Sequence, residues 1–168
     1  METNEGTMDP GLSDKIKDTV LTTAPPKVDL AKRFIAALVD AVLASVVSTI
    51  PVIGSIAGTA YILARDGLDV EFMQGRSIGK KLMKLQPVRL DGEPMDLATS
   101  VRRNWVFAIG ALAGFVAWVP FFGALAVIVL GLLGFLAGVY EIYLVATDPE
   151  GRRYGDRFAG TKVIEVDE

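Results

Sequence analysis

The chain has 168 residues, of which 51% are apolar, and its 17 Lys and Arg against 20 Asp and Glu give a net charge of −3. It contains no Cys and no His, which excludes disulfides, thiolate nucleophiles, imidazole bases and metal sites built from these residues. The acidic balance argues against nucleic acid as a partner, and no nucleophile–base set is recognisable, so we expect no enzyme, no catalytic residue and no cofactor.

Residues 1–27 are polar and end in Pro25 and Pro26, and we expect them to form a disordered cytoplasmic tail. The stretch is acidic at its start, unlike a signal peptide, which begins with basic residues and continues into an apolar core.

Two long apolar blocks follow the tail. Residues 34–64 carry one charge, Asp40, and residues 104–147 carry one charge, Glu141. Apolar runs of about 18 or more residues with few charges are candidates for transmembrane helices. Each block is longer than one helix needs to cross a hydrocarbon layer of roughly 30 Å, and Pro and Gly interrupt each block. We therefore predict two helical hairpins, with helices at about 30–50, 52–67, 103–119 and 121–147.

The basic residues indicate how these hairpins are oriented. Every Lys and Arg lies before residue 34, in the loop 65–103 or in the C-terminal tail, and the turns near Pro51 and Pro120 carry none. By the positive-inside rule, all three basic regions then face the cytoplasm. We expect an all-α membrane protein, a bundle of four transmembrane helices in two hairpins with a mixed cytoplasmic loop, formed by residues 28–168.

Glycines recur at helix-packing spacing in both blocks. A small residue at every fourth position lets two helix backbones approach closely in lipid. We expect these pairs to pack the bundle, with contacts between copies in a homo-oligomer as the alternative. The pairs are Gly54/Gly58, Gly110/Gly114 and Gly134/Gly138.

The middle loop contains "GRSIGKK", which lacks the spacing and the strand-to-helix context of a phosphate-binding loop. The next stretch, "KKLMKLQPVRL", is either a strand leading to a turn at Asp91 and Gly92 or a basic segment on the membrane surface. We favour the second interpretation, which places Lys80, Lys81 and Lys84 near anionic headgroups.

Asp40 is the most informative residue of the first helix. It lies two turns after Arg33 and roughly 10 Å deeper, so a direct bond between them is strained. Glu141 lies at a similar depth on the fourth helix, so the two carboxylates could face each other. Such a pair would share a proton or bind a small cation, with Ser45, Ser48 or backbone oxygens completing the site.

A structural alternative remains open for both carboxylates. Arg102 and Arg103 open the predicted third helix, and either could pair with Asp40 as a structural ion pair. Glu141 stands between Tyr140 and Tyr143, so it could also mark the interfacial aromatic belt.

Three ordered motifs resemble the RDD family of small bacterial membrane proteins, over roughly residues 28–166. In "KRFIAALVDAVL", Arg33 and Asp40 match the arginine and the first aspartate of the family. The loop of the family is similar to "GRSIGKKLMKLQPVRLDGEP". Its C-terminal motif is similar to "RRYGDRFAGTKVIEV", in which Asp156 matches the second aspartate.

The resemblance implies a multi-pass protein of the bacterial inner membrane, with both termini cytoplasmic, and a role in transport of an unspecified ligand; some relatives are associated with sodium/proton exchange. With Arg33 at the cytoplasmic edge, we expect an Arg33–Asp156 pair that clamps the C-terminal tail. Two functions are consistent with this. The first is a small secondary transporter, working as a homo-oligomer, that moves a cation or proton through Asp40. The second is a non-catalytic anchor that binds an unknown protein partner through its tails and loop.

Overall fold

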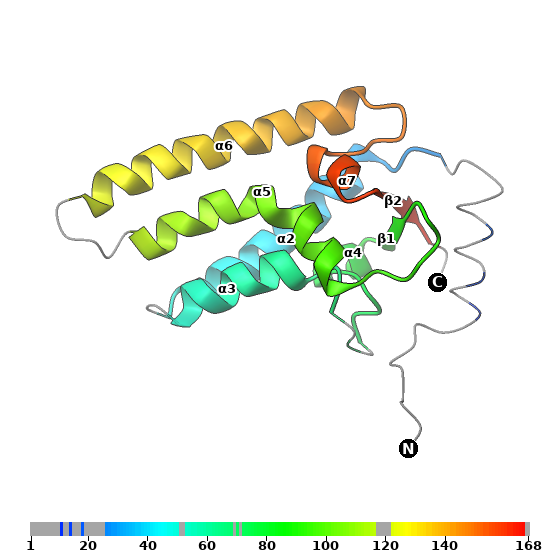
Figure 1. Cartoon of the computed structure of the whole chain (residues 1–168), viewed down its shortest axis with the longest axis horizontal. Coiled ribbons are helices and arrows are strands. Elements are labelled where there is room, and N and C mark those ends of the chain that lie inside the picture. The colour runs from blue at the N-terminus through cyan, green and yellow to red at the C-terminus, as the bar shows by residue number, and fades with distance from the viewer. Residues whose placement is uncertain are drawn as a thin grey trace, which may run out of the picture.

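The computed structural model describes residues 26–50, 53–68, 70, 72–116 and 122–166, together with positions 11, 14 and 18. The chain is mostly helical (Figure 1). Its elements are α2 (Leu30–Ser48), α3 (Ile53–Ala64), α4 (Ile78–Leu82), β1 (Leu85–Arg89), α5 (Leu97–Val116), α6 (Gly123–Thr147), α7 (Tyr154–Phe158) and β2 (Thr161–Glu165). The predicted tail lies largely outside the described residues, as do the turns at Pro51 and Pro120.

The four long helices pack in chain order. α2 packs on α3, α3 on α5 and α5 on α6, whereas no extensive contact joins α2 to α6 among the described residues. The short elements gather at one end of these helices (Figure 1). We call α4, β1, α7 and β2 the cap.

Local signals in the sequence set where two of the long helices begin. The Asp29 carboxylate accepts a hydrogen bond from the backbone N–H of Ala31, 2.7 Å away, and starts α2. The Asp96 carboxylate accepts one from the N–H of Thr99 at 2.6 Å, beside the start of α5 at Leu97. The prediction that this helix begins near residue 103 is therefore wrong, and Arg103 lies inside α5.

The prediction of an all-α chain is also wrong, because β1 and β2 form a two-stranded antiparallel sheet. Leu85 pairs with Glu165 and Arg89 with Thr161, so the middle loop is joined to the C-terminal segment. Of the two interpretations of "KKLMKLQPVRL", the strand is the one that forms. Small apolar clusters pack on its two faces: Val28, Ala36, Leu85 and Val163 on one, and Val88, Ile164 and Val166 on the other.

Two glycines allow the cap to lie directly on helix backbones. A Cβ on Gly79 of α4 would lie 2.0 Å from the carbonyl oxygen of Ala36 on α2. A Cβ on Gly155 of α7 would lie 2.0 Å from the carbonyl oxygen of Arg103 on α5. Only glycine is compatible with such close approach, so these positions fix the cap against the helices.

The predicted glycine pairs have different surroundings. On α3, Gly54 and Gly58 face α2, because a Cβ on either would lie within 2.5 Å of an atom of Val47 or Ser48. On α6, a Cβ on Gly138 would meet no atom within 4 Å. The surroundings of Gly110 and Gly114 lie outside what the structure describes.

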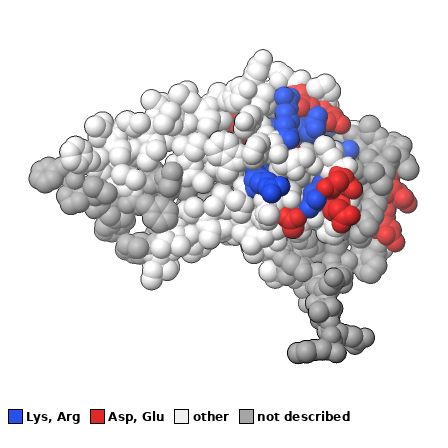
Figure 2. Space-filling view, in the orientation of Figure 1, with Lys and Arg blue, Asp and Glu red and all other residues white. Residues whose placement is uncertain are grey.

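Apolar side chains cover the outside of the helices and charged side chains lie inside. Among the described residues on the face shown in Figure 2, Lys, Arg, Asp and Glu lie on the cap half. Phe34 on α2 and Phe135 on α6 are exposed by 57% and 67%, whereas Asp40, Arg103 and Asp156 are buried. Among the described helices, α6, with 25 residues, is the one long and apolar enough to cross a membrane. α3 is apolar but shorter.

Candidate functional site

Nine charged side chains meet where the long helices join the cap, and we call them the ionic network. Charged groups are rarely buried unless they are paired, and inside a membrane they are costly and tend to be functional. This concentration therefore marks the candidate site. The members are Arg33, Asp40, Arg65, Asp66, Lys80, Arg103, Glu141, Arg153 and Asp156.

Asp40 is bound by groups from α3, the turn after it and α4. Its Oδ2 lies 3.0 Å from Nη1 of Arg65. Its Oδ1 accepts hydrogen bonds from the Tyr61 hydroxyl at 3.0 Å and from the backbone N–H of Gly79 at 2.9 Å. Both carboxylate oxygens are thus engaged by groups that the sequence analysis did not assign to them.

The arginines expected to pair with Asp40 lie elsewhere. Arg102 is exposed on α5. Arg103 is buried, but its Nε lies 3.1 Å from Oδ1 of Asp156 and 3.4 Å from Oδ2 of Asp66. The difference follows from the earlier start of α5, which carries Arg103 past the helix terminus and into the network.

Asp66, directly after α3, forms the second centre of the network. Its Oδ1 lies 2.6 Å from Nζ of Lys80, and its Oδ2 accepts a hydrogen bond from the Asn104 amide at 3.2 Å. Burial alone raises the pKa of Asp66, but the charges of Lys80 and Arg103 outweigh burial and hold that pKa well below its usual value. Burial also lowers the pKa of Lys80, and the charge of Asp66 opposes that effect.

The position of Lys80 corrects the expectation that it lies near lipid headgroups. Its side chain is buried, because its ammonium binds Asp66 at the inner side of α4. Lys81 is half-buried, with its ammonium 4.1 Å from the centre of the Phe72 ring, and Lys84 is exposed. A headgroup contact for Lys81 and Lys84 stays a prediction.

Asp156, in the first turn of α7, is surrounded by arginines. Arg33 Nη2 lies 3.0 Å from its Oδ2, and Arg103 Nε and Arg153 Nη2 lie 3.1 and 3.3 Å from its Oδ1. Arg33 also donates to the carbonyl oxygen of Gly151. Burial raises the pKa of Asp156, but these guanidinium groups outweigh burial and hold it far below its usual value. The structure therefore brings Arg33 and Asp156 together and joins α2, α5 and α7 through them.

Glu141 on α6 is buried and accepts a hydrogen bond from the backbone N–H of Tyr154, 2.8 Å away. Its neighbours Tyr140 and Tyr143 are exposed, so the carboxylate and the two rings point to different sides of α6. Glu141 thereby joins α6 to the start of α7, and it binds Tyr154 instead of facing Asp40.

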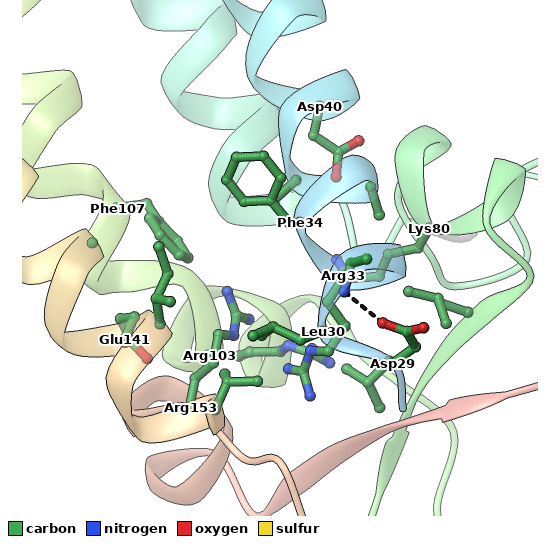
Figure 3. A pocket seen from close by; sticks show the side chains of 18 of the residues that line it. Asp29, Leu30, Arg33, Phe34, Asp40, Lys80, Arg103, Phe107, Glu141 and Arg153 are labelled. Atoms are coloured by element: carbon green, nitrogen blue, oxygen red, sulfur yellow. Dashed lines mark hydrogen bonds between the residues drawn. The ribbon is translucent and has the colours of Figure 1, made fainter. Parts of the chain in front are cut away.

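A cavity of about 760 Å³ lies between α2, α5 and α6, where α2 and α6 are not packed together. Asp40 and Glu141 both line it, as do Arg33, Arg103 and Arg153 (Figure 3). Figure 3 shows the arginines gathered near Glu141, with Asp40 at the other end.

The residues present do not form an evident cation site. Within the described part of the chain, no group of three acidic side chains is placed to hold a metal ion. The hydroxyls of Ser45 and Ser48, which the sequence offered as further ligands, donate to the carbonyl oxygens of Ala41 and Ala44 in their own helix, each at 2.7 Å. Of the charged side chains that line the cavity, five are cationic and three are carboxylates.

The sequence analysis missed Tyr61, Arg65 and Asp66 and misplaced Lys80. A signal for two of them was present: "ARDG" puts an arginine and an aspartate directly after an apolar helix that carries no other charge. Adjacent opposite charges at such a boundary were interpreted only as part of the cytoplasmic loop.

A family model described as the RDD family matches residues 56–160, which is more than half of the chain. The matched region includes Arg65, Asp66, Lys80, Arg103 and Asp156, whereas Arg33 and Asp40 precede it. No curated protein and no solved structure gives a significant match.

Proposed function

Because this chain belongs to the RDD family, we propose that it is a multi-pass membrane protein that binds a ligand in the cavity between α2, α5 and α6. In this proposal the four long helices lie in the bilayer of the bacterial inner membrane, and the cap and both termini lie at the cytoplasmic face. The ionic network holds the cap on the helix ends and shapes the cavity.

The observation that carries the proposal is the reversed distribution of side chains, apolar outside and charged inside. Large apolar side chains lie exposed along α2 and α6, and soluble monomers rarely expose patches of this extent. Lipid covers such a surface without cost, whereas it makes unpaired charges costly, which is why they are buried in pairs.

Helix lengths agree with this arrangement for three of the four helices. At 1.5 Å per residue, α2, α5 and α6 reach roughly 28, 30 and 38 Å, close to the roughly 30 Å of the hydrocarbon layer. α3 reaches only about 18 Å. We propose that the bilayer thins or that polar residues after α3 enter its edge.

Labelling of introduced cysteines tests this topology, and the chain has no cysteine of its own to interfere. Glu93→Cys places a thiol on the cap side and Phe122→Cys one at the opposite end of the helices, both at exposed positions. In intact cells an impermeant maleimide should label Phe122→Cys and should reach Glu93→Cys only after lysis. Labelling of Glu93→Cys in intact cells refutes the proposed orientation.

Transport of a cation or proton through Asp40 is the second candidate, favoured by the cavity that Asp40 and Glu141 both line. It requires Asp40 to exchange its partners, because Arg65, Tyr61 and Gly79 engage both of its oxygens. In reconstituted vesicles, a cation-driven pH change should vanish in Asp40→Asn and persist in Arg89→Ala, a change in a surface ion pair. The absence of flux from the wild-type protein excludes this candidate.

Two further expectations remain proposals. A homo-oligomer would cover the exposed face of α6, and a protein partner would bind the tails or the loop. Cross-linking of the single-cysteine variants in membranes, followed by mass determination, distinguishes a second copy from another protein.

A further inference from the structure

The wall of the cavity has two chemically different parts. Arg33, Arg103 and Arg153 lie together at one end, beside Glu141 (Figure 3). Most of the remaining wall is apolar and comes from α2, α5 and α6: Leu30, Phe34, Ala37, Phe107, Ile142 and Val145. A cationic end that continues into apolar walls is complementary to a molecule with an anionic head and a hydrocarbon tail.

Arg103 provides a second, independent indication of an anion at this end. Its side chain is fully buried and its Nε approaches Asp156. Within the described part of the chain, however, neither Nη1 nor Nη2 has a hydrogen-bond partner. A buried charged group with unused donors is unfavourable and uncommon in folded proteins. The Nη atoms are therefore available for the oxygens of a bound anion.

The charge balance of the ionic network points the same way. The network contains five cations, Arg33, Arg65, Lys80, Arg103 and Arg153, and four carboxylates. One positive charge is thus left over in this network, at the wall of the cavity. An added anion with one negative charge neutralises the network without displacing any of the pairs already made.

We propose that the cavity binds an anionic phospholipid, with its phosphate at Arg33, Arg103 and Arg153 and an acyl chain between α2 and α6. The inference rests on the proposed membrane function, because α2 and α6 must face the bilayer for a lipid to enter between them. Planar guanidinium groups are suited to phosphate oxygens, and basic sites between transmembrane helices bind lipid headgroups. A volume of about 760 Å³ far exceeds what a phosphate ion fills, and the apolar walls offer that ion nothing.

The test is native mass spectrometry of the full chain in a neutral detergent, titrated in separate experiments with phosphatidylglycerol, phosphatidylcholine of the same acyl length, and inorganic phosphate. We expect phosphatidylglycerol to bind at least about tenfold more tightly than phosphatidylcholine, because the choline cation of the latter adds a positive charge beside the arginines. Inorganic phosphate should neither bind detectably nor displace the lipid.

Two pairs of variants separate the anionic end from the apolar walls. Arg103→Gln should weaken phosphatidylglycerol binding about tenfold. Its matched control is Arg102→Gln, the same change at the neighbouring exposed position of α5. Gly138→Leu fills the cavity without touching an ion pair, because a Cβ there meets no atom within 4 Å. Its control is Gly131→Leu, equally open on α6 but outside the cavity wall.

The outcomes decide the proposal even if Arg103→Gln does not fold, since Gly138→Leu leaves the network intact. Loss of binding in Gly138→Leu with retention in Gly131→Leu supports it. Equal binding of the two lipids, wild-type binding in Gly138→Leu, or saturation by inorganic phosphate alone overturns it. Lipid binding measured in detergent does not depend on how the protein is oriented in the cell membrane. Failure here with cysteine labelling as expected therefore refutes the lipid site and leaves the membrane topology standing.

Discussion

Replacing Asp156 with asparagine tests the ionic network most directly. The change preserves size and hydrogen-bonding capacity but removes the negative charge. Asp156 is fully buried and lies within 3.3 Å of guanidinium nitrogens from Arg33, Arg103 and Arg153. Three like charges would then remain in a buried site with their shared counter-ion removed.

The loss of stability in Asp156→Asn depends more on the burial of the ion pairs than on their distances. Breaking a buried ion pair by removing one partner costs about 3–5 kcal/mol. For a chain of this size each kcal/mol lowers the melting temperature by about 2–4 °C, so we expect a fall of roughly 6–20 °C. Asp91 provides the control: its Oδ2 lies only 2.5 Å from Arg89 Nη2, yet its side chain is 54% exposed. Exposed pairs contribute about 0–1 kcal/mol, so Asp91→Asn should change little.

The assay is thermal unfolding in detergent, followed by the loss of monodisperse protein on size exclusion. Asp156→Asn should be nearly as destabilised as Asp156→Ala, because the charge is the decisive property. If Asp156→Asn melts within about 2 °C of Asp91→Asn, the ionic network does not hold the cap and the reasoning is wrong.

Three other predictions use the same assay. Gly79→Ala should cost about 1–3 kcal/mol, because its Cβ would lie 2.0 Å from the carbonyl oxygen of Ala36 and push α4 away from α2. Arg65→Gln and Asp40→Asn should each destabilise strongly, and the double variant should lose less than the sum of the two, because the pair is direct at 3.0 Å. The melting temperature should be nearly constant from pH 7 to about 5 and fall below pH 4. The folded-state pKa of Asp66 lies below its ordinary 3.8, so the unfolded chain takes up the proton first as the pH drops.

Each of these has an outcome that contradicts it. Gly131→Ala, at a helix position open to space, should be neutral or stabilising, and an equal loss there removes the steric explanation for Gly79. Strict additivity of Arg65→Gln and Asp40→Asn indicates that the two side chains do not interact. An Asp66→Asn variant should show a shallower acid transition than the wild type, and an identical pH profile in both excludes Asp66 as its source.

The long helices could be predicted from the sequence because the signal is local. Apolar runs with Pro or Gly between them indicate α2, α3 and α6 to within a few residues. The start of α5 was missed because "DLATSVRRN" is polar, and its helical character depends on Asp96, whose side chain accepts a bond from Thr99. Asp96 is thus a capping residue that indicates a helix start near Leu97, but the prediction relied on apolar character and placed the start later.

The partners of the charged residues could not be predicted in the same way. Asp40 pairs with Arg65, 25 positions away, and this depends on how α3 returns along α2. Strand β1 pairs with a segment that follows three further helices, α5, α6 and α7, so nothing near "LQPVR" identifies its partner. The sequence indicates which residues need a partner, and the packing of distant elements decides which one each receives.

The separation of Arg33 and Asp156 along the chain, 123 positions, has a consequence for biosynthesis. Ribosomes add about 5–20 residues per second, so Asp156 is made roughly 6–25 s after Arg33. During that interval the first helix emerges with an arginine whose counter-ion has not yet been synthesised, and water or headgroups must solvate it. Closure of the cap is thus a late step, because it requires translation of α7 and β2. A nascent chain stalled before α7 would contain the four long helices but lack the Asp156 carboxylate that joins them to the cap.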